Sequence, residues 1–312
     1  MLDSYHRNID YLRVALTDRC NLKCWYCCGR GDHQRLPAGD KLTHEEFVRL
    51  LGIAVERLGI TKIRLTGGEP LLYERLEELI IYLRNLEPLR ELTLTTNGLL
   101  LAEKAEMLKQ AGLQRLNVSL EGATDHAYRM ITGRNCLGEV LAGLKALLHA
   151  GFAKPKLNIV LCRYFTLDEL GQLLEIGRRW ASELRFIELM GHADADYPTV
   201  QDMMQLFSRL VPLRPLPGVG TATIRYGMET PEPTLGFIPS RTHPFCDACR
   251  RIRLASDGRL RTCLFTRQGI QLREVLRKGG GDEELTAIMR QAVLNKPHAA
   301  PGTEVIMAEV GG

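Results

Sequence analysis

The sequence predicts an α/β fold: a partial, about six-stranded parallel (βα) barrel, like an incomplete TIM barrel, followed by a smaller C-terminal domain. Three observations lead to this prediction. Short β-rich runs alternate with amphipathic helical stretches, several of these runs carry polar residues on one face, and the alternation ends near Pro212. The expected strands cover residues 13–17, 62–66, 92–96, 116–120, 157–161 and 184–189.

Two helix starts between these strands carry a clear signal. Thr43 is followed three residues later by Glu46, and Thr166 by Glu169. Each pair can form a capping box, in which the hydroxyl and the carboxylate satisfy opposite backbone donors. We therefore expect helices to begin directly after Thr43 and Thr166.

Polar strand residues favour a barrel over a sheet that is covered on both faces. Lys62, Arg64 and Thr66 share one face of their strand, because alternate residues of a strand point the same way. A doubly covered sheet is apolar on both faces, whereas an open barrel accommodates a polar lumen. Its chemistry is then expected at the C-terminal ends of the strands. For any single strand, a solvated edge face is the alternative.

The C-terminal third has a different composition. Stretches rich in Pro and Gly cover residues 212–220 and 231–239, and a further helix is expected over residues 282–294. These features predict a division into residues 1–211, the partial barrel, and residues 212–312, a smaller C-terminal region.

Composition excludes several classes of protein. The net charge of +4 is too small to indicate general nucleic-acid binding. No run of about 18 apolar residues is long enough to span a membrane, and residues 1–13 lack the apolar middle of a secretory signal. Nine cysteines, an odd number in a chain of 312 residues, disfavour a secreted disulfide framework. We expect a cytoplasmic protein that binds no membrane and no nucleic acid.

The cysteines instead form two groups that indicate metal binding. Cys20, Cys24 and Cys27 lie in one short segment after the first expected strand, in the spacing C-x3-C-x2-C. Three thiolates suit a four-iron cluster with one open iron, and a zinc site completed by water or histidine is the alternative. Cys28 falls outside this spacing.

The second group has the same two interpretations. It consists of Cys246, Cys249 and, after thirteen intervening residues, Cys263. Completed by His243, these cysteines would make an ordinary structural zinc set. An iron–sulfur cluster with three cysteine ligands is the other interpretation.

The first cysteine spacing, with Tyr26 before its last cysteine, resembles the radical S-adenosylmethionine (SAM) superfamily. The segment Gly67-Gly68-Glu69-Pro70 resembles the GGEP motif of that family, although on its own it reads as a tight turn between a strand and a helix. The resemblance implies a [4Fe-4S] cluster on Cys20, Cys24 and Cys27 whose open iron binds SAM and cleaves it to a 5′-deoxyadenosyl radical. The SAM contacts that it implies are Tyr26, Gly68, Thr95, Ser119 and Met190. Thr95 and Ser119 have helix capping as their alternative role.

The segment from Phe245 to Phe265 is similar to the C-terminal signature of the MoaA family of GTP 3′,8-cyclases. This resemblance implies a second [4Fe-4S] cluster on Cys246, Cys249 and Cys263 that contacts the purine of GTP. It also implies a basic substrate site made of Arg13, Lys62, Arg64, Lys156, Arg185, Arg251 and Arg253. Arg251 and Arg253 are the catalytic candidates near the radical, together with a terminal Gly311-Gly312 that enters the active site in the family. Guanidinium groups suit phosphates because they engage two oxygens at once.

The implied reaction is conversion of GTP to 3′,8-cyclo-7,8-dihydro-GTP, by a lyase of molybdenum-cofactor biosynthesis. The implied partners are GTP, a reductant protein, a downstream cyclic pyranopterin synthase and a second copy of the chain in a homodimer. The chain reads Ser119-Leu120-Glu121 where the family commonly has Ser-Leu-Asp. Such departures leave open a paralogue that acts on another nucleotide or a peptide. A metal-stabilised binding or electron-carrying protein is the non-enzyme alternative.

Overall fold

The computed structural model describes residues 1–28, 36–191, 196–217, 222–228, 233–266 and 268–300. Its centre is one curved sheet whose strands follow the order β12-β11-β10-β1-β2-β3-β4-β5-β6-β9-β8-β7. The run from β10 to β9 is parallel throughout, and the strands beyond it at either edge are antiparallel. The strands are β1 (Tyr11–Ala15), β2 (Lys62–Thr66), β3 (Glu91–Thr96), β4 (Arg115–Ser119), β5 (Lys156–Leu161), β6 (Glu183–Glu188), β7 (Arg214–Leu216), β8 (Ile224–Gly227), β9 (Thr234–Ile238), β10 (Arg251–Leu254), β11 (Arg259–Arg261) and β12 (Ile270–Gln271).

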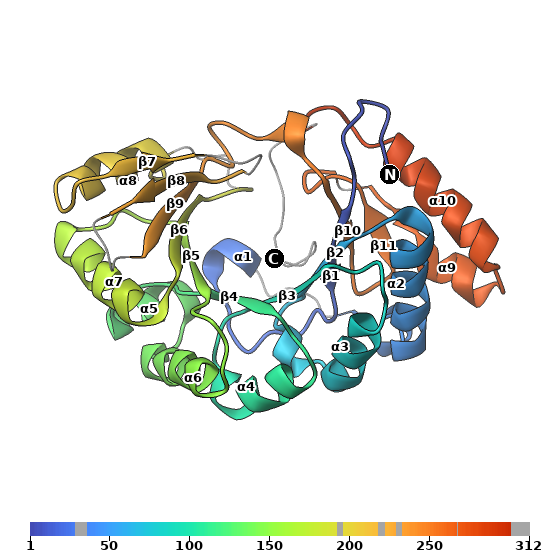
Figure 1. The fold of residues 1–312 in the computed structure, drawn as a ribbon, viewed down its shortest axis with the longest axis horizontal. Helices are drawn as coiled ribbons and strands as arrows, with labels where there is room; N and C mark the ends of the chain where they lie inside the picture. Colours follow the sequence, from blue (N-terminus) through green and yellow to red (C-terminus); the bar gives the residue numbers. More distant parts are fainter. Residues whose placement is uncertain (29–35, 192–195, 218–221, 229–232, 267, 301–312) are drawn as a thin grey trace.

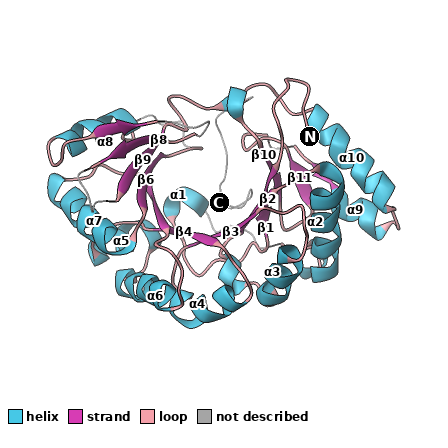
Figure 2. Cartoon of the chain, viewed as in Figure 1, coloured by secondary structure: helices cyan, strands magenta, loops and turns pink. Residues whose placement is uncertain are grey.

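Helices cover the convex side of this sheet, and the short helix α1 lies on the concave side (Figures 1 and 2). The helices are α1 (Trp25–Cys28), α2 (His44–Leu58), α3 (Leu76–Arg84), α4 (Leu101–Gln110), α5 (Asp125–Thr132), α6 (Leu137–His149), α7 (Leu167–Trp180), α8 (Val200–Ser208), α9 (Leu272–Arg277) and α10 (Asp282–Leu294). The arrangement is a partial barrel, as predicted. None of the described helices is long and apolar enough to cross a membrane.

The six predicted strands form the middle of the sheet, with β1 as the main displacement. That strand was expected at residues 13–17 but spans Tyr11–Ala15, because Tyr11 already pairs with Lys62 on one side and Arg251 on the other. Thr17 belongs to the loop that follows, where its carbonyl accepts a hydrogen bond from Gly68 N at 2.7 Å.

Two parallel strands were not foreseen, and both come from the C-terminal third of the chain. β9 pairs with β6 at one side of the barrel, and β10 pairs with β1 at the other. Residues after 211 therefore extend the sheet at both edges. The division at residue 211 stays a prediction.

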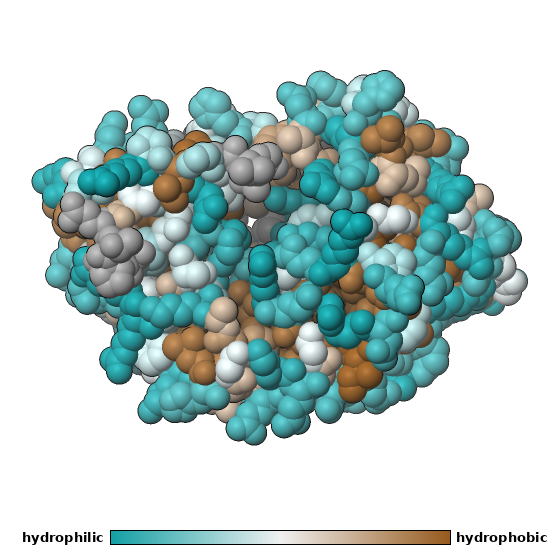
Figure 3. Space-filling view, in the orientation of Figure 1, coloured by the Kyte–Doolittle hydropathy of each residue, from teal (hydrophilic) through white to brown (hydrophobic). Residues whose placement is uncertain are grey.

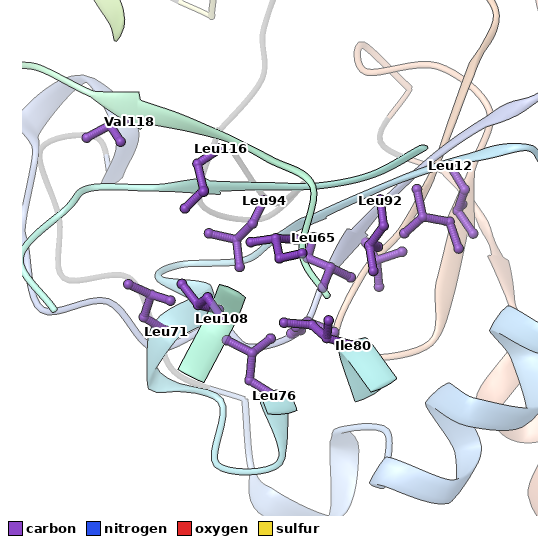
Figure 4. Close-up of a cluster of buried hydrophobic side chains, with 14 of the residues drawn as sticks. Leu12, Leu65, Leu71, Leu76, Ile80, Leu92, Leu94, Leu108, Leu116 and Val118 are labelled. Atoms are coloured by element: carbon purple, nitrogen blue, oxygen red, sulfur yellow. The ribbon is translucent and has the colours of Figure 1, made fainter. Parts of the chain in front are cut away.

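The two faces of the sheet differ in polarity. Leu12, Leu65 and Leu94 point toward the helices and are fully buried, as are Ile80 of α3 and Leu108 of α4, against which this part of the sheet packs (Figure 4). Burying each such side chain stabilises the fold by about 1.5–3 kcal/mol. In the space-filling view the surface is hollowed at the centre, and hydrophilic residues surround the hollow (Figure 3).

The predicted helix starts are confirmed. Thr43 and Thr166 are the N-caps of α2 and α7, and in both cases the capping box is complete. The helix predicted over residues 282–294 is α10.

The capping box of α7 gives a test of the fold. Thr166→Ala removes the hydroxyl that accepts from Glu169 N at 3.2 Å. We expect a loss of about 1 kcal/mol in the free energy of unfolding, measured by urea denaturation of the metal-free protein. Thr166→Ser keeps the hydroxyl and should lose far less. Equal stability of the two variants would contradict the capping role.

Candidate active site

The first cysteine group lies in the loop that follows β1 and continues into α1. Cys20, Cys24 and Cys27 are half-buried, and Cys27 N donates to the carbonyl of Cys24 at 2.9 Å. Three cysteines in one short loop are a donor set that fits a four-iron cluster with an open iron. The structure therefore provides suitable ligands at the C-terminal end of the first barrel strand, where a parallel barrel holds its active site.

Glu69 ties this cysteine loop to the neighbouring strand ends. Its carboxylate is buried and accepts hydrogen bonds from Thr96 Oγ1 at 2.7 Å and from Asn97 N at 2.8 Å. Its own backbone N donates to the carbonyl of Arg19 at 2.7 Å. Burial raises the pKa of Glu69 to about 7, although the hydrogen bonds act in the opposite direction. Sequence reasoning assigned this motif to SAM through its glycines and missed the positioning role of the carboxylate.

The two glycines of the motif let the β2 loop approach the cysteine loop. A Cβ atom at Gly68 would lie 2.3 Å from the carbonyl oxygen of Arg19, and one at Gly67 would lie 2.7 Å from that of Thr17. Gly67 also has φ +155°, which a residue with a side chain rarely adopts. Close packing of the two loops is therefore enough to explain why glycines stand at both positions, as the tight-turn interpretation requires. The SAM contact of Gly68 stays a prediction.

The other predicted SAM contacts come from successive strands. Thr95 and Ser119 are half-buried at the ends of β3 and β4, and Met190 is half-buried just after β6. The capping alternative is wrong for Thr95 and Ser119, because the helices that follow have Leu100 and Thr124 as their N-caps.

Tyr26 reaches across to the end of β4. Its hydroxyl lies 2.8 and 2.9 Å from the two carboxylate oxygens of Glu121, the residue that replaces the aspartate common in the family. Burial raises the pKa of Glu121 to about 7, and the hydrogen bond from Tyr26 lowers it. The longer side chain therefore links the cysteine loop to the β4 end.

The second cysteine group lies at the ends of β10 and β11. Cys249 precedes β10, Cys263 follows β11, and these strands are antiparallel, so the two cysteines lie at the same end of the pair. Cys246 is joined to Cys249 by a hydrogen bond from Cys249 N to its carbonyl at 3.1 Å. All three are free thiols, again a donor set that fits a four-iron cluster. Among the described residues, no three His, Cys, Asp or Glu side chains lie close enough together to hold one metal ion.

Basic side chains gather on the concave face between the two cysteine groups. Arg13 of β1 is in register with Arg64 of β2 on one side and Arg253 of β10 on the other. One step earlier along the strands, Tyr11 is in register with Arg251, whose guanidinium lies 5.8 Å from the tyrosine ring centre. Lys62 of β2 is in register with Tyr11 on the other side, so the parallel pairing of three strands places five predicted substrate residues on one wall.

This wall carries more positive charge than its described neighbours neutralise. Burial and the charge of Arg251 lower the pKa of Arg253 to about 10, and burial and Arg253 likewise lower the pKa of Arg13. In the described part of the chain, Arg64, Arg251 and Arg253 form no ion pair, and neither Arg64 Nε nor Arg253 Nη1 has a hydrogen-bond acceptor. Buried charges of one sign are costly unless they are paired, so this wall suits an anion with several charges.

Three of the predicted substrate residues are paired with carboxylates. Lys62 Nζ lies 2.8 Å from Glu91, and on the opposite wall Lys156 Nζ and Arg185 Nε lie 2.6 and 3.0 Å from Glu183. Sequence reasoning missed both carboxylates. The alternation of residues along the strands could have identified these carboxylates, because Glu91 and Glu183 are the first residues of their strands and lie on the polar face.

Glu188 organises the approach to the second cysteine group. This fully buried carboxylate accepts hydrogen bonds from the backbone N of Arg241 at 2.9 Å and of Thr242 at 2.8 Å, and from Val200 N at the start of α8 at 3.1 Å. It thereby fixes the segment that leads from β9 to Cys246. The predicted catalytic pair Gly311 and Gly312 lies outside the described residues.

Comparisons with known proteins identify the family of the chain. A family model described as the radical SAM superfamily matches residues 14–176, and one described as Molybdenum Cofactor Synthesis C matches residues 182–301. A GTP 3′,8-cyclase of Mycolicibacterium smegmatis is 43% identical, and the match covers 95% of this chain and 86% of that protein. One from Moorella thermoacetica is 38% identical, and the match covers 100% of both chains.

Solved structures support the fold alone. Streptococcus suis SuiB bound to S-adenosylmethionine matches with a TM-score of 0.60 at 17% identity, over 90% of this chain and 68% of SuiB. Native anSMEcpe with bound AdoMet matches with a TM-score of 0.52 at 17% identity, over 64% of this chain and 59% of its own. The fold, the two cysteine groups and the nearly full-length relatives together establish the family: the chain belongs to the radical SAM superfamily and, within it, to the GTP 3′,8-cyclases.

Proposed function

We propose that this protein is a radical SAM lyase that converts GTP to 3′,8-cyclo-7,8-dihydro-GTP in molybdenum-cofactor biosynthesis. One observation carries the proposal beyond family membership. The Cys20 loop follows the C-terminal end of β1, whereas Cys249 precedes the N-terminal end of β10, the parallel neighbour of β1. The arginines in register on these strands therefore lie between the two cysteine groups, where a substrate must lie to reach both.

The basic wall gives GTP its binding site in this proposal. Arg13, Arg64, Arg251 and Arg253 bind the triphosphate through charge-assisted hydrogen bonds, which Arg forms with two oxygens at once. Lys62, Lys156 and Arg185 add polar contacts while their carboxylate partners fix their side chains. Arg251 and Arg253 also lie two and four residues after Cys249, so they hold the substrate beside the second cysteine group.

The cofactors have donors of their own. Cys20, Cys24 and Cys27 would hold one [4Fe-4S] cluster, and Cys246, Cys249 and Cys263 the other; Tyr26, Gly68, Thr95, Ser119 and Met190 would contact SAM. With SAM bound, the first cluster would supply the radical chemistry. The C3′ hydrogen of GTP would pass to the 5′-deoxyadenosyl radical, C3′ would bond to C8 of guanine, and one electron and one proton would complete the 7,8-dihydro product. The contribution of the protein is to hold C3′ and C8 in reach of each other and to exclude water.

The proposed partner proteins follow from this chemistry. SAM cleavage consumes an electron, so a reductant protein must supply one, and a cyclic pyranopterin synthase takes the product. We further propose a cytoplasmic location and assembly as a homodimer. Size measurement of the purified protein by light scattering tests the dimer directly.

Turnover tests the reaction. The reconstituted protein is incubated anaerobically with SAM, dithionite and GTP, and products are followed by mass spectrometry. We expect 5′-deoxyadenosine and a GTP isomer with a 3′–8 bond to form together. Formation of 5′-deoxyadenosine with GTP unchanged would keep the radical chemistry and reject GTP as substrate.

Substitution of Arg253 tests the basic wall. Arg253→Gln removes a buried charge with little change in volume, and we expect GTP affinity to fall about 10- to 100-fold, since a hydrogen bond to a charged group contributes about 1.5–3 kcal/mol. Equilibrium GTP binding provides the measurement. Arg90→Gln, at an exposed position, is the control and should bind normally. Unchanged affinity in Arg253→Gln would remove Arg253 from the phosphate site.

A further inference from the structure

A buried lysine lies beside the second cysteine group. Lys296 follows α10, only 2% of it is exposed, and its Nζ donates to the carbonyl of Arg251 at 3.0 Å and to that of Thr262. The sulfurs of Cys249 and Cys263 are its neighbours of opposite charge. An ammonium group has three donors, so the two carbonyls leave one donor for a further partner.

The two carbonyls belong to the two cysteine-bearing segments. Arg251 lies two residues after Cys249, and Thr262 directly precedes Cys263. Lys296 therefore bridges the backbone beside both cysteines. A single side chain thus fixes the separation of two of the three thiols.

Arg7 fixes the segment that carries this lysine to the third cysteine. Its Nη1 donates to the carbonyls of Cys246 and His298, both at 2.9 Å, and its Nη2 donates to that of Pro297 at 2.7 Å. Asp3 holds the guanidinium in place with an ion pair of 2.6 Å. The segment after α10 is consequently attached to all three cysteine positions.

The electrostatics of Lys296 point to the cluster as its partner. Burying an amine is costly unless an opposite charge or hydrogen-bond acceptors compensate for it. Within the described residues, no carboxylate forms an ion pair with Lys296, and its charged neighbours of opposite sign are the thiolates of Cys249 and Cys263. The positive charge of Lys296 therefore acts on the cysteine sulfurs and not on a carboxylate.

We propose that Lys296 is a positioning residue for the second iron–sulfur cluster: its hydrogen bonds to the carbonyls of Arg251 and Thr262 set the spacing of Cys249 and Cys263, and its buried positive charge raises the reduction potential of that cluster. Hydrogen bonds to ligating sulfurs and nearby charge are among the factors that set cluster potentials. This inference rests on the proposed assignment of Cys246, Cys249 and Cys263 as the ligands of the cluster.

The test uses Lys296→Met, which keeps most of the length of the side chain and removes its donors. The wild-type protein and the variant are both reconstituted with iron and sulfide at full length. The same pair is also prepared with Cys20, Cys24 and Cys27 changed to Ser, so that the second cluster is observed alone. The measurements are the rate of iron loss to a chelator and the midpoint potential from a redox titration followed by electron paramagnetic resonance. Lys145→Met, exposed on α6, is the matched control.

We expect Lys296→Met to lose second-cluster iron about tenfold faster and to have a more negative second-cluster potential, with Lys145→Met unchanged. Lys296→Arg, which keeps charge and donors, should recover most of the potential. If Lys296→Met does not fold, Lys296→Gln, with a shorter donor, replaces it. Unchanged iron loss and potential in a folded variant would overturn the proposal.

The same experiment separates this proposal from the ligand assignment beneath it. Wild-type protein with two clusters holds roughly eight iron atoms per chain, four in each. A wild-type protein with only four would reject the second ligand set, and the role of Lys296 with it. Full iron loading combined with an unaffected Lys296→Met variant would reject the role of Lys296 alone.

Discussion

The parallel pairing of β1 with β10 is the constraint on which the rest of the site depends. It joins segments separated by about 240 residues and places Arg13 between Arg253 and Arg64 in one row across three strands. Because β10 runs parallel to β1, the cysteines before it and those after β1 lie at opposite ends of the same strand pair. A shift of one residue in this register would move Arg253 to the convex face and break the row.

The barrel divides its charge between two walls. On the side of β5 and β6, the buried carboxylate of Glu183 lies within ion-pair distance of Lys156, Arg185 and Arg225. On the β1 side Glu91 pairs only with Lys62, no described carboxylate forms an ion pair with Arg64, Arg251 or Arg253, and burial and mutual repulsion lower the arginine pKa values. One wall is thus balanced within the protein, and the other suits an anion with several charges.

Buried carboxylates also hold the loops on which the cofactor ligands lie. Glu69 joins the first cysteine loop to the β3 end, Glu121 contacts Tyr26, and Glu188 fixes the segment that leads to the second group. Each accepts hydrogen bonds from loop residues. A radical reaction requires reactants held in place.

The sequence alone determined the six central strands, the capped helices, both cysteine groups and the family, because period-2 alternation, capping boxes and cysteine spacing are local properties of the chain. It did not indicate that β9 and β10 extend the barrel, since short strands with little alternation become parallel only when a neighbour supplies their hydrogen bonds. Nor did it separate the paired cations, such as Lys156, from the wall around Arg253. Only the tertiary structure decided that, and it alone brought Arg7 and Lys296 to the second cysteine group, because pairing and burial depend on residues that are distant in the chain and adjacent in space.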